Sequence, residues 1–146
     1  MNTISRFSPV LVRGLLGFIF FVFGLNGFLQ FIPQPPPPPA AGAFFGALAA
    51  TGYMLPLIMS AQVVAGALLL SNRFVPLALA LLAPVIVNVV LFHAVLAPGG
   101  IGVALAVLAL ELATAWMYRG AYASMLQART APTASNTRPV QAPASA

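Results

Sequence analysis

The chain has 146 residues, of which 61% are hydrophobic and only 5% are charged. Soluble domains carry about 25% charged residues, so this chain cannot cover a soluble core with a polar surface. Its length allows about four membrane-spanning helices with short connections and no separate soluble domain. Because the sequence contains no cysteine, structural disulfides, thiolate metal sites and dithiol redox relays are excluded.

Positive charge lies at the ends of the apolar segments. The formal net charge of +5 comes from six arginines and one glutamate. These arginines do not share one helix face, so they do not predict a nucleic-acid surface. Loops that carry arginine face the cytoplasm, and the distribution therefore predicts four spans with both termini cytoplasmic. The positions are Arg6, Arg13, Arg73, Arg119, Arg129 and Arg138.

The first predicted span covers residues 10–31 and reaches about 33 Å as a helix, enough to cross a hydrocarbon core of about 30 Å. It is longer than the apolar region of a signal peptide, about 7 to 15 residues, and lacks a small-x-small cleavage site, so we expect a retained span. Its glycines predict close packing against a neighbouring helix, although glycine is also common in membrane helices generally. They are Gly14, Gly17, Gly24 and Gly27.

A proline run at residues 35–39 follows the first span. Consecutive prolines adopt an extended polyproline conformation, so we expect a stiff spacer outside the hydrocarbon; docking of a partner protein is the alternative. Residues 40–50 are apolar but too short to cross a bilayer, and Thr51 and Gly52 then break the run. This pattern predicts a short interfacial or re-entrant helix.

Three further spans are predicted at residues 53–70, 74–96 and 101–118, the last with a less apolar helical extension through about residue 127. The turn between the second and third is short, so these two spans are expected to be antiparallel neighbours. Pro84 in the third span predicts a kink. The predicted fold is an all-α integral membrane four-helix bundle with a short interfacial helix after a proline-rich loop. Residues 1–128 form one membrane domain, and residues 129–146 are predicted to be a disordered cytoplasmic tail.

Glu111, the single acidic residue, falls about 15 Å along the fourth span. A carboxylate at that depth has to face the bundle interior, stay neutral or pair with a cation, because an ionised group facing lipid is costly. We expect Arg13 to contact Glu111, with Gln62 nearby as a hydrogen-bonding group. Such a pair could fix the register of the helices, or the carboxylate could carry a proton or orient a ligand.

Asn26 and Gln30 share a face near the outer end of the first span, and Asn88 lies in the outer half of the third. The pattern predicts an outer polar patch. Its groups could form interhelical hydrogen bonds, or they could line a pocket for a polar headgroup or a quinone carbonyl. Interhelical hydrogen bonding is the simpler interpretation.

His93 is the single histidine, and it projects about 140° away from Asn88 on the same helix, so the two do not predict one shared site. Bis-histidine haem ligation would need a second subunit, and zinc normally takes three or four ligands. We therefore expect no metal site. The sequence has no phosphate-binding glycine loop in a strand-turn-helix context, no nucleophile elbow and no paired carboxylates, so no catalytic residue is assigned.

The pattern resembles the DoxX-like family of small bacterial four-helix membrane proteins. The likeness covers roughly residues 13–119, and the segment 73–93 is its most specific part. It is carried by Arg13 and Gly17, the stretches 24–28 and 51–53, Gly66 with residues 68–70, the stretches 73–79 and 83–88, Phe92, His93 and Glu111.

This resemblance implies a multi-pass protein of the bacterial inner membrane. It also implies an accessory subunit of a quinone-linked redox system, with redox-complex subunits or a second copy as partners and quinone as the molecule bound. Many relatives carry a lysine near Gly27 and an acidic residue where Gln62 stands, so roles that depend on those charges are not carried over. The alternative is a non-enzymatic bundle that binds a lipid, a small molecule or a partner protein.

Overall fold

The computed structural model describes residues 3–123 and residue 128. Within these residues all regular structure is helical, as predicted, and the expected tail at residues 129–146 lies outside them. The α-helices are α1 (Thr3–Leu29), α2 (Pro39–Ala50), α3 (Met54–Leu70), α4 (Val75–Val95) and α5 (Ile101–Met117), and the 3-10 helices are η1 (Pro98–Gly100) and η2 (Arg119–Tyr122).

The helix bounds follow the apolar runs closely. Both α4 and α5 match the predicted spans to within a residue at each end, and α2 matches the predicted short helix, with Pro39 in its first turn. The first helix differs from its predicted span of residues 10–31. It begins earlier, at Thr3, and therefore contains Pro9. Past α5 the chain continues as the 3-10 helix η2, and residues 124–127 of the expected helical extension lie outside the described residues.

Three helical segments are long and apolar enough to cross a membrane: Pro9–Leu29, Val75–Val95 and Pro98–Met117. The pair α2 and α3 gives a fourth only if it is counted as one broken span, since the two helices meet at 94°. With 17 residues α3 reaches about 26 Å by itself. Three or four segments can therefore cross a bilayer, where every backbone polar group has to be paired within a helix.

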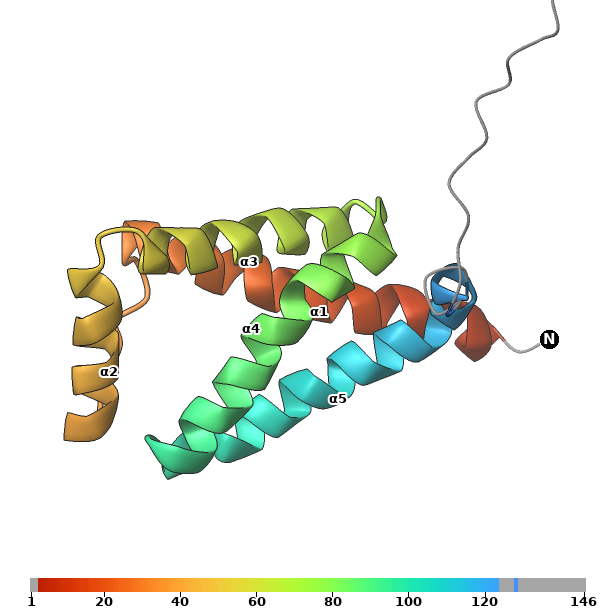
Figure 1. Cartoon of the computed structure of the whole chain (residues 1–146). Helices are drawn as coiled ribbons and strands as arrows, with labels where there is room; N and C mark the ends of the chain where they lie inside the picture. Colours follow the sequence, from red (N-terminus) through yellow and green to blue (C-terminus); the bar gives the residue numbers. More distant parts are fainter. Residues whose placement is uncertain (1–2, 124–127, 129–146) are drawn as a thin grey trace, which may run out of the picture.

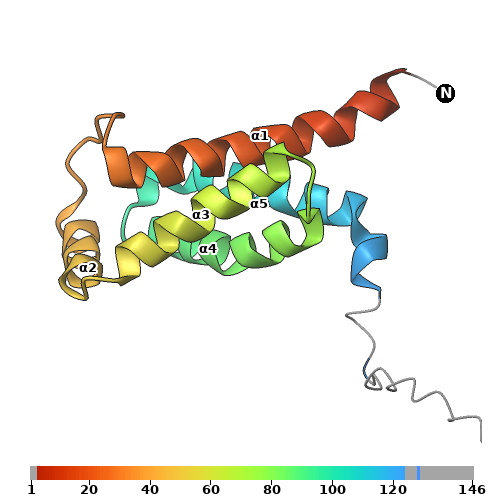
Figure 2. The same ribbon diagram turned by 90° about the horizontal axis from the view of Figure 1, so that it is seen from above.

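The helices pack as two crossing layers with α2 at one end (Figures 1 and 2). The most extensive contact joins α1 and α3, which run side by side in opposite directions. The second layer is formed by α4 and α5, which cross the first pair. At the end opposite the N-terminus, α2 lies across the ends of the other helices and contacts α3.

Glycine allows α1 and α3 to approach closely. A Cβ added to Gly66 would lie 2.8 Å from the carbonyl oxygen of Gly17, and one added to Gly17 would lie 2.9 Å from the Cβ of Leu69. Further along, Gly24 lies against Val63 and Gly27 against Met59. The predicted packing role is thus confirmed for three glycines of α1, whereas Gly14 has no atom within 4 Å of its added Cβ and the prediction is wrong there.

Apolar side chains fill the space between the two layers, and further apolar side chains cover the outside. Outward-facing Phe18, Leu57 and Val103 are each more than half exposed. An outer surface of this kind is compatible with a lipid bilayer and not with a polar coat of the soluble type. The largest fully buried side chains are Leu16, Leu69, Leu79, Leu82, Ile86 and Thr114.

The turn between α3 and α4 closes the end of the molecule that carries the N-terminus of α1 (Figure 1). Asn72 has a positive φ of 56°, and its N–H donates to the carbonyl of Leu69 while the N–H of Arg73 donates to that of Leu68. This is a Schellman motif, with asparagine in the left-handed position that glycine usually takes. Tyr118, at the end of α5, donates its hydroxyl to Asn72 Oδ1 at 3.1 Å and ties that helix to the turn.

Candidate functional site

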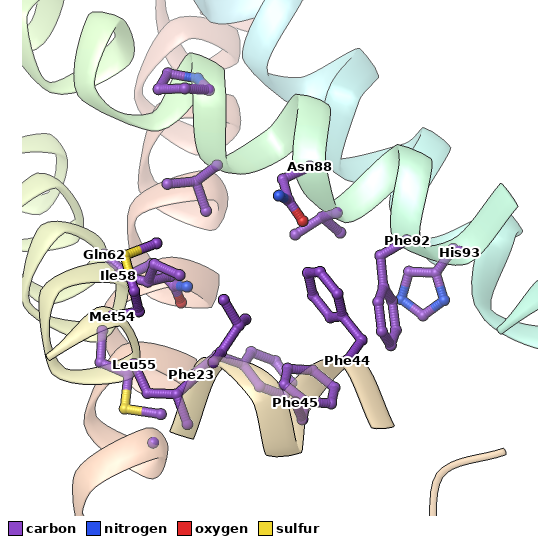
Figure 3. A pocket seen from close by; sticks show the side chains of 16 residues that line it. Phe23, Phe44, Phe45, Met54, Leu55, Ile58, Gln62, Asn88, Phe92 and His93 are labelled. Atoms are coloured by element: carbon purple, nitrogen blue, oxygen red, sulfur yellow. The ribbon is translucent and has the colours of Figure 1, made fainter. Parts of the chain in front are cut away.

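A cavity of about 430 Å³ lies where α2, α3 and α4 meet, with α1 contributing one wall (Figure 3). Its volume is within the range of small-molecule pockets, about 300–1,000 Å³. We call it the α2 pocket. It is lined by Phe23, Gly27, Phe44, Phe45, Leu48, Met54, Leu55, Ile58, Met59, Gln62, Pro84, Val85, Asn88, Val89, Phe92 and His93.

Aromatic rings from α2 close one side of the pocket against α4. The ring centroids of Phe45 and Phe92 lie 5.1 Å apart, and those of Phe44 and Phe92 lie 5.8 Å apart, in tilted arrangements. Aromatic pairs at such separations are attractive beyond the area they bury. These ring contacts join the short helix α2 to α4, so α2 forms part of the cavity wall and is not only a connection between spans.

Two amide side chains enter this apolar cavity from facing helices. Gln62 comes from α3 and Asn88 from α4, and Figure 3 shows their amides on opposite sides of the pocket. Gln62 is half-buried and Asn88 is exposed, and neither amide forms a hydrogen bond with another described residue. Each offers two N–H donors and a carbonyl acceptor. The pocket therefore combines apolar walls with a few unpaired polar groups, the usual character of a small-molecule site.

His93 lies at the edge of the pocket beside Phe92, with ring centroids 5.2 Å apart and the rings nearly perpendicular (Figure 3). Its Nδ1 lies 3.1 Å from the carbonyl oxygen of Ala97. His93 and Asn88, which the helix geometry did not place in one obvious site, both line this pocket. Although they point in different directions from α4, the pocket curves along that helix and both residues line it.

Asn26 has a local role that differs from the expected polar patch. It is 7% exposed, and its Oδ1 accepts a hydrogen bond of 2.6 Å from the N–H of Ile32. Its amide therefore fixes the chain where α1 ends. Gln30 is exposed, and of the three predicted patch residues only Asn88 lines the pocket. The predicted polar patch does not form, because the side chain of Asn26 is hydrogen-bonded to the turn after α1.

The expected contact between Arg13 and Glu111 is absent from the described residues. Arg13 instead donates from Nη1 to the carbonyl of Leu69, while its Nε and Glu111 Oε2 are buried without a hydrogen-bond partner. Gln62 is not near Arg13 either, because it packs beside Gly24, 11 residues or about 16 Å further along α1. The prediction grouped Arg13, Gln62 and Glu111 because they lie at similar depths along their spans. In the structure they lie apart, because depth does not determine which helix faces pack together.

The residues that sequence reasoning missed are those of α2. The sequence predicts only a short apolar helix around Phe44 and Phe45, with no binding role, yet these two rings form the aromatic wall of the pocket. Two adjacent phenylalanines in an otherwise alanine- and glycine-rich helix are the available signal. Large rings in a helix of small residues indicate a face that packs against something.

In the part of the chain that the structure describes, no group of three or more histidine, cysteine, aspartate or glutamate side chains could hold a metal ion. A scan against protein-family models, a search of curated proteins and a search of solved structures each found no match to this chain. The resemblance to the DoxX-like family therefore stays a prediction.

Proposed function

We propose that this protein is a four-span membrane protein that binds a neutral, lipid-soluble molecule of the quinone class in the α2 pocket. The observation that carries the proposal is the pair of unpaired amides, Gln62 and Asn88, facing each other across a cavity with aromatic walls. A quinone ring would lie against Phe44, Phe45 and Phe92, and its carbonyl oxygens would accept hydrogen bonds from the amide N–H groups.

The chemistry of the lining favours this class over a phospholipid headgroup. Apart from His93, whose imidazole can be charged or neutral, the pocket lining contains no ionisable side chain. A phosphate in such a site is normally neutralised by arginine or lysine, and the arginines of the described residues lie elsewhere. A neutral ligand with hydrogen-bonding oxygens fits the amides without an unpaired charge.

Binding would be the contribution of this chain to a redox system. In the proposed role the protein holds or delivers the quinone for partner subunits in a bacterial inner membrane. Among the described residues we assign no catalytic group. The resemblance to the DoxX-like family motivates this part of the proposal, and the pocket provides a site for the ligand.

Binding is tested with a short-chain benzoquinone and the protein purified in mild detergent. The double variant Gln62→Leu with Asn88→Leu should lower the affinity by about tenfold or more, because two hydrogen bonds to the ligand are lost. Gln30→Leu is the matched control, since Gln30 is exposed and lies outside the pocket. Equal affinity of the double variant and the wild type would refute the site, and absence of binding to the wild type would refute the function.

The proposed topology places the N-terminus, the turn at Ser71 and η2 on the cytoplasmic side, because the arginines of the described chain lie at that end. Since the chain has no cysteine, a single introduced thiol reports its own location. In intact cells, Gln34→Cys should react with an impermeant maleimide and Ser71→Cys should not. Reaction of both would mean that α3 does not cross the membrane, and three spans would replace four.

A further inference from the structure

The imidazole of His93 is held in one orientation by the chain that follows α4. Its Nδ1 lies 3.1 Å from the carbonyl oxygen of Ala97, and Phe92 packs edge-on against it. The third contact is with the backbone of Gly100 in η1, where an added Cβ would overlap the ring. These contacts hold the ring in one orientation, with Nδ1 directed at the carbonyl of Ala97.

The contact with Ala97 also determines which nitrogen carries the proton. A backbone carbonyl can only accept a hydrogen bond, so the Nδ1 of His93 has to be the donor. In the neutral imidazole the other nitrogen, Nε2, is then left with a lone pair and acts as an acceptor. Within the described chain Nε2 has no hydrogen-bond partner, and it is not among the fully buried unpaired atoms.

His93 therefore differs from the other polar groups of the pocket. The amides of Gln62 and Asn88 can donate or accept, whereas neutral His93 presents an acceptor only. A ligand whose oxygens are all carbonyls or ethers can be bound by the amides but leaves Nε2 without a partner. A ligand with a hydroxyl group has a donor that can pair with Nε2 as well.

We propose that His93 Nε2 accepts a hydrogen bond from a hydroxyl group of the ligand, so that the α2 pocket favours a phenol or hydroquinone over the corresponding ether or quinone. This inference rests on the proposed function and specifies it further. In this inference Ala97 and Gly100 are positioning residues, because they hold the His93 ring that would contact the ligand.

The histidine is unique in the chain, so ¹⁵N-labelled histidine gives one pair of ring-nitrogen NMR signals for the full-length protein. In the neutral imidazole we expect the proton on Nδ1 and a lone pair on Nε2. An alkylphenol should shift the Nε2 signal, and its methyl ether, an alkylanisole of the same chain length, should not. A spectrum with the proton on Nε2 would overturn the inference whatever binds.

Affinity provides the second measurement. The wild type should bind the alkylphenol about five- to tenfold more tightly than the alkylanisole, the usual effect of one hydrogen bond. His93→Phe should abolish this preference, His93→Gln should retain part of it through its amide oxygen, and Gly100→Ala should weaken it by displacing the ring.

The outcomes separate this inference from the function on which it rests. Equal binding of phenol and ether by the wild type, with benzoquinone also bound, would overturn the role of His93 and leave the pocket as a quinone site. If none of the three molecules binds, the proposed function is wrong and the inference is wrong with it. Should His93→Phe not fold, Gly100→Ala and the wild-type spectra still decide, because they leave the histidine in place.

Discussion

Arg13 in α1 donates a hydrogen bond from its Nη1 to the backbone carbonyl of Leu69 in the last turn of α3. The final carbonyls of a helix carry partial negative charge, so a guanidinium at this position adds a charged donor to an end carbonyl and interacts favourably with the helix dipole. The same carbonyl accepts the N–H of Asn72. Arg13 therefore joins α1 to the turn that positions α4.

Replacing Arg13 by methionine should lower the free energy of unfolding by about 1–3 kcal/mol, the range for a charge-assisted hydrogen bond. The measurement is a denaturant titration of the protein in mild detergent. Arg73→Met is the matched control, because Arg73 is exposed, and it should change the free energy by less than about 0.5 kcal/mol. Equal losses in the two variants would show that Arg13 contributes only its charge.

Gly66→Ala should weaken the contact between α1 and α3 by about 1–3 kcal/mol, because the added methyl group would meet the backbone of α1 and the helices would have to separate. Gly14→Ala, also in α1, is the contrasting variant, for which we expect no loss in the free energy of unfolding. Space is open around Gly14, and alanine is the better helix former by up to about 1 kcal/mol, so this variant should be as stable as the wild type or more so. Thermal unfolding of both variants in detergent tests the contrast, and similar losses would contradict it.

The helices could be predicted from the sequence because their cause is local. A long apolar run in lipid has to pair its own backbone groups, so the run lengths predict α4 and α5 nearly to the residue. The lateral arrangement could not be predicted in the same way. When nearly every residue of a helix is apolar, no face stands out from the others in the sequence, and the faces that meet are selected by close packing of small residues such as Gly17 and Gly66.

The candidate site shows the same limit. Its polar residues could be predicted, since an amide or imidazole stands out in an apolar span, but their grouping could not. Gln62, Asn88 and His93 line one pocket because α3 packs against α4, and α2, which meets α3 at 94°, closes that pocket with its phenylalanines. The break at Thr51 and Gly52 is a local pattern and could be predicted. The contacts of the two α2 phenylalanines with Phe92 join residues far apart in the chain and could not be predicted.

Glu111→Gln should raise the free energy of unfolding by about 1–2 kcal/mol. Glu111 is 6% exposed, and its Oε2 has no hydrogen-bond partner, so the fold bears the cost of removing an ionisable carboxyl group from water. An amide of the same shape costs less to bury. Denaturant titration in mild detergent measures the change, with Glu111→Leu as a second variant of similar volume. A loss of stability in Glu111→Gln would show that the carboxyl group has a partner that an amide cannot replace.

Tyr122 gives the protein a dependence on alkaline pH. It lies in η2, outside the spans, where it donates its hydroxyl to the carbonyl of Pro76 at 3.1 Å. Burial of the phenol, and secondly the charge of Glu111, raise the pKa of Tyr122 above its ordinary value of about 10. Both causes disfavour the phenolate in the folded state.

The sign of the effect follows from this direction. Below about pH 10 the tyrosine is neutral in the folded and unfolded states, and its contribution to stability is fully present; as the pH rises through the raised pKa, the unfolded chain loses its proton more readily and that contribution is lost. Melting temperatures of the wild type should therefore fall more steeply above about pH 10 than those of Tyr122→Phe. Tyr53→Phe, at an exposed position, should follow the wild type, and a wild-type slope in Tyr122→Phe would assign the alkaline loss to other groups.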